Sequence, residues 1–148
     1  MPPEIVIRAL APQDAARVQD FVRGLSAQSR RERYFSAIKE LTPAQLERTL
    51  TPDVSLAAFD GARVVGIAEC SRGEFAVVVA DAWQGSGLGR ELMRRLLEHA
   101  RARGVPTLHG IVRRGNRAML CLGRSLGFRA ARDPDPDLVQ MELELAPA

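Results

Sequence analysis

The sequence predicts an α/β (α+β) fold in which a mixed, mostly antiparallel central sheet of six to seven strands is flanked by about four helices. Two observations lead to this prediction. Three apolar strand patterns follow one another with only tight turns between them, as in an antiparallel meander, whereas the later strands alternate with amphipathic helices. The length of 148 residues suits one domain, and we assign residues 1–148 to it.

The first half of the chain predicts a strand, two helices and the meander. An edge strand is expected at Ile5-Val6-Ile7, and Asp14 is expected to cap a helix with apolar residues at helical spacing. Residues 25–35 are polar and rich in arginine, and we expect a connector there. Thr42, followed by proline and then glutamine, predicts the start of a second helix. Strands are expected over residues 54–59, 63–70 and 74–80.

The second half alternates helices with strands. A helix with a continuous apolar stripe begins near Leu88 and ends before Gly104. A strand over residues 107–112 precedes a short helix that starts after Asn116. The last expected elements are a proline-containing loop over residues 133–137 and a strand over residues 138–145.

Composition excludes several classes of function. The net charge is +3 and the pI about 9.5, but the basic residues are interspersed with acids, which argues against nucleic-acid binding. No apolar segment is long enough for a membrane span, and the N-terminus lacks signal-peptide features, so we expect no membrane partner and a cytoplasmic location. Cys70 and Cys121 lie in apolar surroundings and are expected to be buried free thiols. His99 and His109 lack metal-ligand spacing, so no metal is expected.

The run from Gln84 to Gly89 has the strongest functional signal. It contains three glycines in five residues and joins an apolar strand to a helix. Glycine allows backbone to approach a ligand closely, and the N-terminus of a helix attracts anions. The run therefore predicts either a site for a phosphate-bearing cofactor or a plain glycine-rich connection. The glycines alone do not decide between the two.

Two nucleotide-binding motifs do not fit this run. Gly85, Gly87 and Gly89 are spaced one residue more tightly than the dinucleotide-binding pattern requires, and an antiparallel meander precedes them. A Walker loop would end in lysine followed by serine or threonine, and no lysine is present here.

The wider pattern resembles the GCN5-related N-acetyltransferase (GNAT) family over essentially the whole chain. The resemblance rests on Gln-x-x-Gly-x-Gly after the fourth strand, a helix, a fifth strand, and then Asn116 followed by a helix that closes with Leu126-Gly127-Phe128. Glutamine stands where the family has arginine or glutamine. The segments beginning at Leu25, Glu74 and Asn116 look like the catalytic domain of bacterial protein-lysine acetyltransferases.

The resemblance implies an acetyl-CoA site and a sheet in which the fourth and fifth strands splay apart. Backbone groups of the glycine run would hold the pyrophosphate, the edge of the fourth strand would pair with the pantetheine arm, and the second short helix would contact it. The cofactor-binding residues implied in this way are Val77, Val78, Val79, Gln84, Gly85, Ser86, Gly87, Leu88, Gly89, Arg90, Asn116 and Met119. The Val79 N–H is the candidate donor to the thioester oxygen. Asn116 has the alternative role of a helix N-cap.

The resemblance also places a catalytic glutamate at Glu74, which we expect to be partly buried at the start of the fourth strand, with Glu69 as the second candidate. Many family members have a tyrosine acid seven residues after the asparagine, but Gly123 occupies that position here. Cys121 and Ser125 lie nearby, and Tyr34 is distant in sequence. A thiolate with a pKa of about 8.5 can leave without a dedicated acid.

The acceptor is expected to be a primary amine, either a protein lysine or a small amine. The family's acceptor side corresponds to residues 30–34 and to the loop over residues 133–137, whose aspartates either attract the amine or form a solvated turn. A non-catalytic acyl-CoA-binding module and an unrelated phosphate-binding regulator are the alternatives. The sequence leaves a homodimer open.

Overall fold

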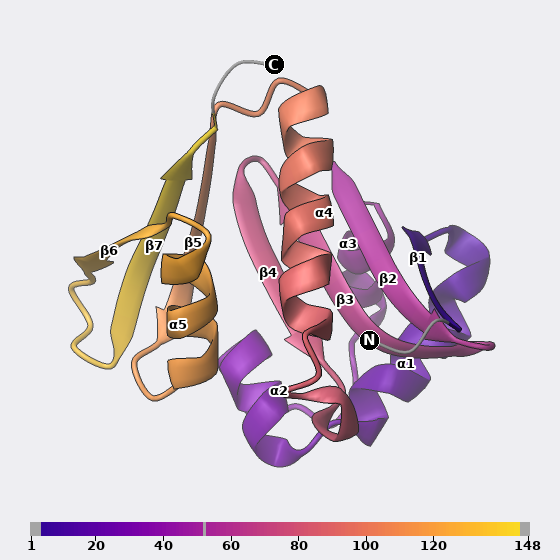
Figure 1. The fold of residues 1–148 in the computed structure, drawn as a ribbon. Coiled ribbons are helices and arrows are strands. Elements are labelled where there is room, and N and C mark those ends of the chain that lie inside the picture. Colours follow the sequence, from indigo (N-terminus) through magenta and orange to yellow (C-terminus); the bar gives the residue numbers. More distant parts are fainter. Residues whose placement is uncertain (1–3, 52, 146–148) are drawn as a thin grey trace.

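The computed structural model describes residues 4–51 and 53–145, and its centre is a seven-stranded sheet. The strand order is β1-β2-β3-β4-β5-β7-β6, and all neighbouring pairs are antiparallel except β4 and β5. The predicted mixed, mostly antiparallel sheet is thereby confirmed (Figure 1). The strands are β1 (Ile5–Ala9), β2 (Val54–Asp60), β3 (Arg63–Ser71), β4 (Glu74–Val79), β5 (Thr107–Arg113), β6 (Arg129–Arg132) and β7 (Leu138–Glu144).

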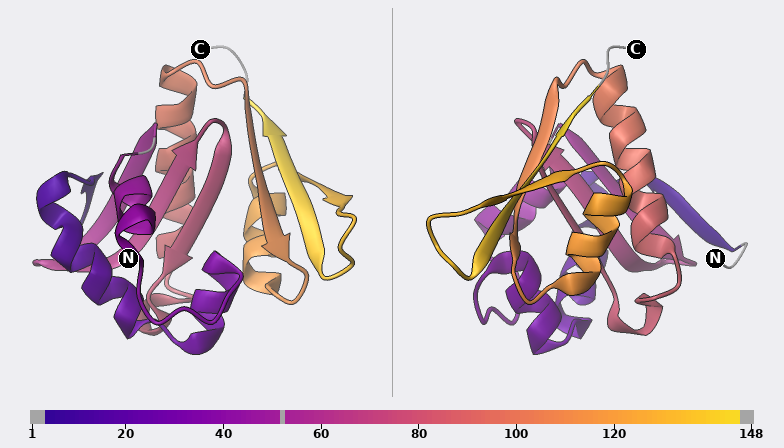
Figure 2. Two further views of the ribbon diagram at one scale, coloured as in Figure 1. Left: turned by 180° about the vertical axis from the view of Figure 1, so that it is seen from behind. Right: turned by 60° about the vertical axis from the view of Figure 1, so that its left-hand side comes forward.

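Five α-helices cover the two faces of the sheet. On one face lie α4 and α5, and on the other lie α1, α2 and α3 (Figure 2). Their bounds are α1 (Ala15–Gly24), α2 (Ala27–Tyr34), α3 (Pro43–Leu50), α4 (Leu88–Ala102) and α5 (Arg117–Ser125), and two short 3-10 turns, η1 (Pro12–Asp14) and η2 (Asp81–Trp83), precede α1 and α4. Each face has its own apolar cluster, so the sheet is covered on both sides where it is central.

Side chains of β4 alternate between these two clusters. Phe75 packs with the α4 cluster, whereas Val78 packs with the cluster beneath α1. Because neighbouring strand residues point to opposite faces, Glu74 lies on the same face as Val78, which is the face that α2 covers. The strand thus presents its glutamate on one side and its valines Val77 and Val79 on the other.

The parallel strands β4 and β5 pair at one position, at the start of β4, and then diverge. One residue pair, Glu74 with His109, joins them, and the His109 N–H donates to the Gly73 carbonyl at 2.8 Å. Beside this junction the Phe75 ring lies against Gly110, where a Cβ would be 2.7 Å from the ring. This packing holds β4 and β5 together at one end of the gap between them, and the gap opens toward α2 at its other end (Figure 1). The expected splay is confirmed.

Two elements were missed by the sequence analysis. Residues expected to form a connector form α2, whose N-cap Ser26 accepts a hydrogen bond from the Ser29 N–H at 3.1 Å. Strand β6 was not expected because its four residues, Arg129–Arg132, are all exposed and show no alternation. It exists through pairing with β7.

Asp14 stands at the N-cap position of α1, but its side chain does not cap that helix. The buried carboxylate instead accepts a bidentate pair of bonds from Arg8 at 2.9 and 3.0 Å and the Ala11 N–H at 2.9 Å. The hydrogen bonds from Arg8 hold the pKa of Asp14 at about 2, below its ordinary value of 3.8. Asp14 therefore fixes β1 to the start of α1.

We predict that Asp14→Asn lowers the free energy of unfolding at pH 7 by about 2 kcal/mol, since one pKa unit corresponds to about 1.4 kcal/mol. The folded pKa lies below the unfolded value, so this stabilisation is complete above the unfolded pKa and is lost as the pH falls through the folded pKa of about 2. Denaturant unfolding between pH 7 and pH 2 measures it. The exposed Asp20→Asn serves as control, and a deficit in Asp14→Asn that persists undiminished at pH 2 would contradict the assignment.

Candidate functional site

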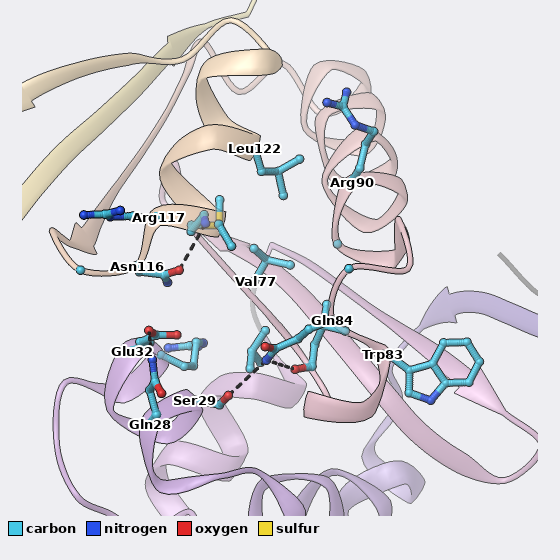
Figure 3. A pocket seen from close by; sticks show the side chains of 18 of the residues that line it. Gln28, Ser29, Glu32, Val77, Trp83, Gln84, Arg90, Asn116, Arg117 and Leu122 are labelled. Atoms are coloured by element: carbon cyan, nitrogen blue, oxygen red, sulfur yellow. Dashed lines mark hydrogen bonds between the residues drawn. The ribbon is translucent and has the colours of Figure 1, made fainter.

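A cavity of about 500 Å³ lies where β4 and β5 have separated. Its walls come from α2, β4, the loop before α4, the first turn of α4 and the start of α5 (Figure 3). Four separate chain segments form this wall, and its residues include Gln28, Ser29, Glu32, Val77, Val79, Gln84, Gly85, Gly87, Arg90, Asn116, Arg117 and Met119.

The glycine loop bends through backbone conformations that favour glycine. Gly85 has a φ of 79° and Gly87 a φ of 90°, both in the left-handed region. Gly87 is the N-cap of α4, and the Ser86 hydroxyl accepts the Leu88 N–H at 3.3 Å. The next N–H groups, at the first turn of α4, have no partner within the helix and face the loop side. The loop thus exposes backbone donors at the positive end of a 15-residue helix dipole.

The edge of β4 that faces the gap carries free backbone groups. The Ala80 N–H donates to Val65 on β3 at 2.9 Å. Because hydrogen-bonded and non-hydrogen-bonded pairs alternate between antiparallel strands, Val78 bonds to β3, whereas Val77 and Val79 do not. The N–H and C=O groups of these two residues therefore point into the gap, where the Val79 C=O accepts a hydrogen bond from the Gln84 amide and the other three groups have no strand partner. An extended ligand could pair with them as an added strand does.

A second helix end points at the same cavity. The Asn116 side chain accepts the Met119 N–H at 3.2 Å, so Asn116 is the N-cap of α5. Arg90 lies in the first turn of α4, and Arg117 lies in the first turn of α5. The Arg90 guanidinium donates to Ser125 at 2.6 Å, which links α4 to the last residue of α5. The N-termini of α4 and α5 and these two arginines, from different parts of the wall, add positive potential that suits an anionic ligand (Figure 3).

Hydrogen bonds tie the glycine loop to α2. Asp81 accepts the Ser26 N–H at 3.0 Å and the Ser29 hydroxyl at 3.1 Å. Partial burial alone would raise the pKa of Asp81, but these hydrogen bonds outweigh it and hold the pKa below its ordinary value. The Gln84 amide donates to the Ser29 hydroxyl at 3.2 Å and to the Val79 carbonyl at 3.2 Å (Figure 3). Gln84 thus positions the loop with its side chain.

A smaller cavity of about 190 Å³ adjoins the first on the α2 face of the sheet. Of the two cavities, only the smaller one is lined by Glu74, Phe35 and Ile111. The residues that line both cavities are Glu32, Arg33, Val77, Asn116 and Met119. The two cavities therefore meet between the splayed strands, at the backbone of β4.

The two candidate glutamates differ in their surroundings. The carboxylate of Glu69 is paired with Arg33, and both side chains are mostly buried. Glu74 lies at the mouth of the smaller cavity and makes no ion pair or side-chain hydrogen bond with the described residues. The expectation that Glu74 is partly buried is wrong, because the β3–β4 turn leaves the first residue of β4 exposed.

Position 123 has no access to the cavity. Gly123 is buried, and a Cβ there would lie 2.4 Å from the Met141 methyl group, on the side of α5 that packs on β7. Of the possible substitutes for the family's tyrosine, Ser125 is bonded to Arg90. Tyr34 packs in the α1 cluster. Cys121 is exposed rather than buried, which corrects the expectation, whereas Cys70 is buried as expected and burial raises its pKa.

Most predicted cofactor residues line the larger cavity, with two exceptions. Leu88 is fully buried in the core, and the Ser86 hydroxyl accepts the Leu88 N–H at the start of α4, so neither residue lines the cavity. The sequence analysis missed the contribution of α2, namely Gln28, Ser29 and Glu32, and it missed Arg117. The only available signal was the Leu25-Ser26-x-x-Ser29 pattern, which resembles a helix start. The Asp133–Asp137 loop lines neither cavity; Asp133 and Asp135 each accept a backbone N–H of their own turn.

Other kinds of site receive no support from residues 4–51 and 53–145. Nowhere in these ranges do three His, Cys, Asp or Glu side chains gather as a metal would require. No helix within them is long and apolar enough to cross a membrane.

The geometry shows a sheet that opens between β4 and β5 beside the N-terminus of α4. Comparison with known proteins identifies the family. The sequence profile described as "Acetyltransferase (GNAT) family" matches residues 22–128. The chain belongs to the GNAT family of N-acetyltransferases, a family that uses acetyl-CoA.

Relatives and solved structures support the same assignment. An acetyltransferase of Pseudomonas aeruginosa is 38% identical over 145 residues, which covers 88% of this chain and 78% of that protein. The GNAT domain of S. lividans PAT has a TM-score of 0.88 at 25% identity, covering 94% of this chain and 89% of that one. An acetyltransferase of Salmonella typhimurium solved with acetyl-CoA shares the fold, with a TM-score of 0.77 at 23% identity over 97% of this chain and 95% of that one.

We predict that Ser29→Ala lowers the free energy of unfolding by about 1 kcal/mol, because it removes one hydrogen bond to Asp81 and one from Gln84. The same change releases the loop, so the affinity for acetyl-CoA should fall with it. Denaturant unfolding and a binding titration measure the two effects. The exposed Ser36→Ala is the matched control, and equal stability of the two variants would show that the network does not hold α2.

Proposed function

We propose that this protein transfers the acetyl group of acetyl-CoA to a primary amine by direct attack, with Glu74 as general base. The observation that carries the proposal is the junction of the two cavities at β4. A ligand in the larger cavity and an amine in the smaller one would meet beside Val77, with Glu74 on the amine side. Such placement replaces a bimolecular encounter by a positioned one.

The residues of the larger cavity fit acetyl-CoA. The glycine loop and the ends of α4 and α5 offer donors and positive potential to the pyrophosphate. The pantetheine arm has amides that can pair with the free edge of β4 at Val77 and Val79. Val78 also lines this cavity, while its backbone bonds to β3 within the sheet.

The chemistry requires the acceptor nitrogen to lose two protons and to replace the carbon–sulfur bond of the thioester by a carbon–nitrogen bond. A lysine-type ammonium has a pKa of about 10.4, so it must lose a proton before it can attack. Glu74 accepts that proton, directly or through a water. The amine nitrogen then forms a bond to the thioester carbon, the carbon–sulfur bond breaks, CoA leaves as the thiolate, and the nitrogen gives its second proton to that thiolate or to water. The Val79 N–H stabilises the oxygen that gains charge during the attack.

The acceptor is a primary amine, and a protein lysine is the leading candidate. Small amines are the alternative. A partial match to a relative that acts on a protein is the ribosomal-protein-alanine N-acetyltransferase of Salmonella typhimurium, which is 40% identical over 86 residues and covers 58% of this chain and 56% of that protein. A non-catalytic acyl-CoA-binding module is the second candidate function. The absence of a tyrosine at position 123 favours it, and the exposed Glu74 beside the cavity junction favours the enzyme.

The fluorescence of Trp83, the single tryptophan, which lies directly before the loop, reports binding of acetyl-CoA. Mass spectrometry of acetylated products across an amine and peptide panel reports transfer. It is preferable to a thiol reagent because Cys121 is exposed. Binding together with acetylation supports the proposal, whereas binding without acetylation of any acceptor would identify a binding module.

We expect Glu74→Gln to lower kcat at neutral pH about 100-fold, which is the lower end of the usual contribution of a general base. The affinity for acetyl-CoA should stay nearly unchanged, since Glu74 does not line the larger cavity. The deficit should shrink as the pH approaches the pKa of the amine, because the free amine then needs no base. Glu98→Gln, an exposed change on α4, is the control. Unchanged turnover at saturating amine and neutral pH would exclude the role of Glu74.

We expect Gly87→Ala to weaken acetyl-CoA binding about fivefold or more, because a φ of 90° strains a residue with a Cβ by about 1–2 kcal/mol and moves the loop. Titration of the Trp83 fluorescence measures the affinity. Gly24→Ala is the matched control, since Gly24 has an ordinary φ and open space around it. Equal affinity of Gly87→Ala and the unchanged protein would place the cofactor elsewhere.

A further inference from the structure

We propose that the smaller cavity selects a primary ammonium carried on an apolar stem, with no carboxylate next to the amine. This inference rests on the proposed function and names the class of acceptor that the site takes. It follows from the charges in the cavity wall, from the apolar side chains at its mouth and from the backbone of Phe35.

The charged side chains in the wall favour a cation over an anion. Glu32, from α2, and Glu74, from β4, both line the cavity. Glu32 is half-buried, and its carboxylate accepts one bond from Gln28 at 3.2 Å. Arg33 is the only cationic residue among the described residues of this wall, and it is paired with the mostly buried Glu69. An ammonium group therefore meets two carboxylates, whereas a substrate carboxylate would have to compete with Glu69 for Arg33.

The mouth of the cavity exposes apolar side chains. The described residues include three exposed large hydrophobic side chains, and two of them, Phe35 at 50% exposure and Ile111 at 48%, line this cavity. Leu138 completes the apolar side of the wall. Water-exposed apolar surface of this kind is stabilised when an apolar stem covers it. The stem of the acceptor would lie between α2 and β5.

Phe35 is held in a conformation that favours glycine. It is the C-cap of α2, with a φ of 59°, where helices usually place glycine or asparagine. Strained residues of this type concentrate at functional sites, where the surrounding structure maintains them. The strained cap places an aromatic ring at the cavity mouth, and folding alone would favour a glycine there.

The same chemistry occurs in two sources, a lysine side chain within a peptide and a small arylalkylamine. Both have an ammonium on an apolar stem and lack a neighbouring carboxylate. Free α-amino acids fall outside the class, since their carboxylate sits one carbon from the amine. The cavity thus excludes free amino acids by charge.

The first experiment measures binding to the protein saturated with CoA, so that it does not depend on turnover. Phenylethylamine, phenylalanine and Nα-acetyl-lysine N-methylamide are titrated separately and followed by protein NMR. Phenylethylamine and phenylalanine share the ring and the amine and differ in the carboxylate. We expect phenylethylamine and the lysine derivative to bind at least about tenfold more tightly than phenylalanine. Phenylalanine binding as tightly as phenylethylamine would overturn the inference.

Variants then test the named residues. Glu32→Gln should raise the Kd for phenylethylamine about fivefold, as loss of a charge-assisted contact does, and the titration is made with CoA at saturation because Glu32 also lines the larger cavity. Glu98→Gln is the control and should leave the Kd unchanged. Phe35→Gly should weaken phenylethylamine binding while the protein keeps or gains stability, and Phe35→Leu should retain part of the affinity. An unchanged Kd in both Glu32→Gln and Phe35→Gly would contradict the assignment.

The two proposals fail separately. Acetylation of free amino acids in preference to both carboxylate-free probes would leave the acetyltransferase function in place and overturn the selectivity. Selective binding of the carboxylate-free amines without acetyl transfer to any of them would retain the selectivity and overturn the enzymatic function. Comparison of kcat/KM for phenylethylamine and for the lysine derivative distinguishes the two sources.

Discussion

The junction between β4 and β5 determines the geometry of the whole site. A single residue pair, Glu74 with His109, and the contact of Phe75 with Gly110 hold the two strands together at one end. Beyond that pair the strands separate, and the backbone of Val77 and Val79 loses its neighbour on one side. Unpaired backbone groups in a sheet interior are costly. They are accommodated here because the gap opens to a cavity in which solvent or an extended ligand can satisfy them.

The opening of the sheet would be of little use without the elements around it. The N-termini of α4 and α5 converge on the gap from one face, and α2 closes it from the other. The Ser29 hydroxyl donates to Asp81 and accepts from the Gln84 amide, and these two hydrogen bonds connect the glycine loop to α2. The same short helix therefore lies against both cavities, with Ser29 on the loop side and Glu32 where the cavities meet.

Charge is distributed according to this division. Of the two cavities, Arg90 and Arg117 line only the larger one and Glu74 lines only the smaller one, while Glu32 lies where they meet. Arg33 is the only cationic side chain among the described residues of the smaller cavity, and its pairing with Glu69 offsets its charge. Under the proposed function, an anionic acyl donor and a cationic acceptor would approach opposite sides of one strand.

The sequence by itself determined the order of most strands and helices, the glycine loop and the family pattern, because these depend on local turn chemistry and on periodic apolar residues. Asp60-Gly61, the capping box at Thr42 and the glycines at 85 and 87 are signals of this local kind. Only the tertiary structure decided that α2 is a helix and that β6 is a strand. An eight-residue polar segment is marginal as a helix alone and depends on Asp81, more than 50 residues away. Likewise, the pairing of Glu69 with Arg33 and the convergence of Glu32, Phe35, Glu74 and Ile111 join four separate segments, and no local pattern encodes such contacts.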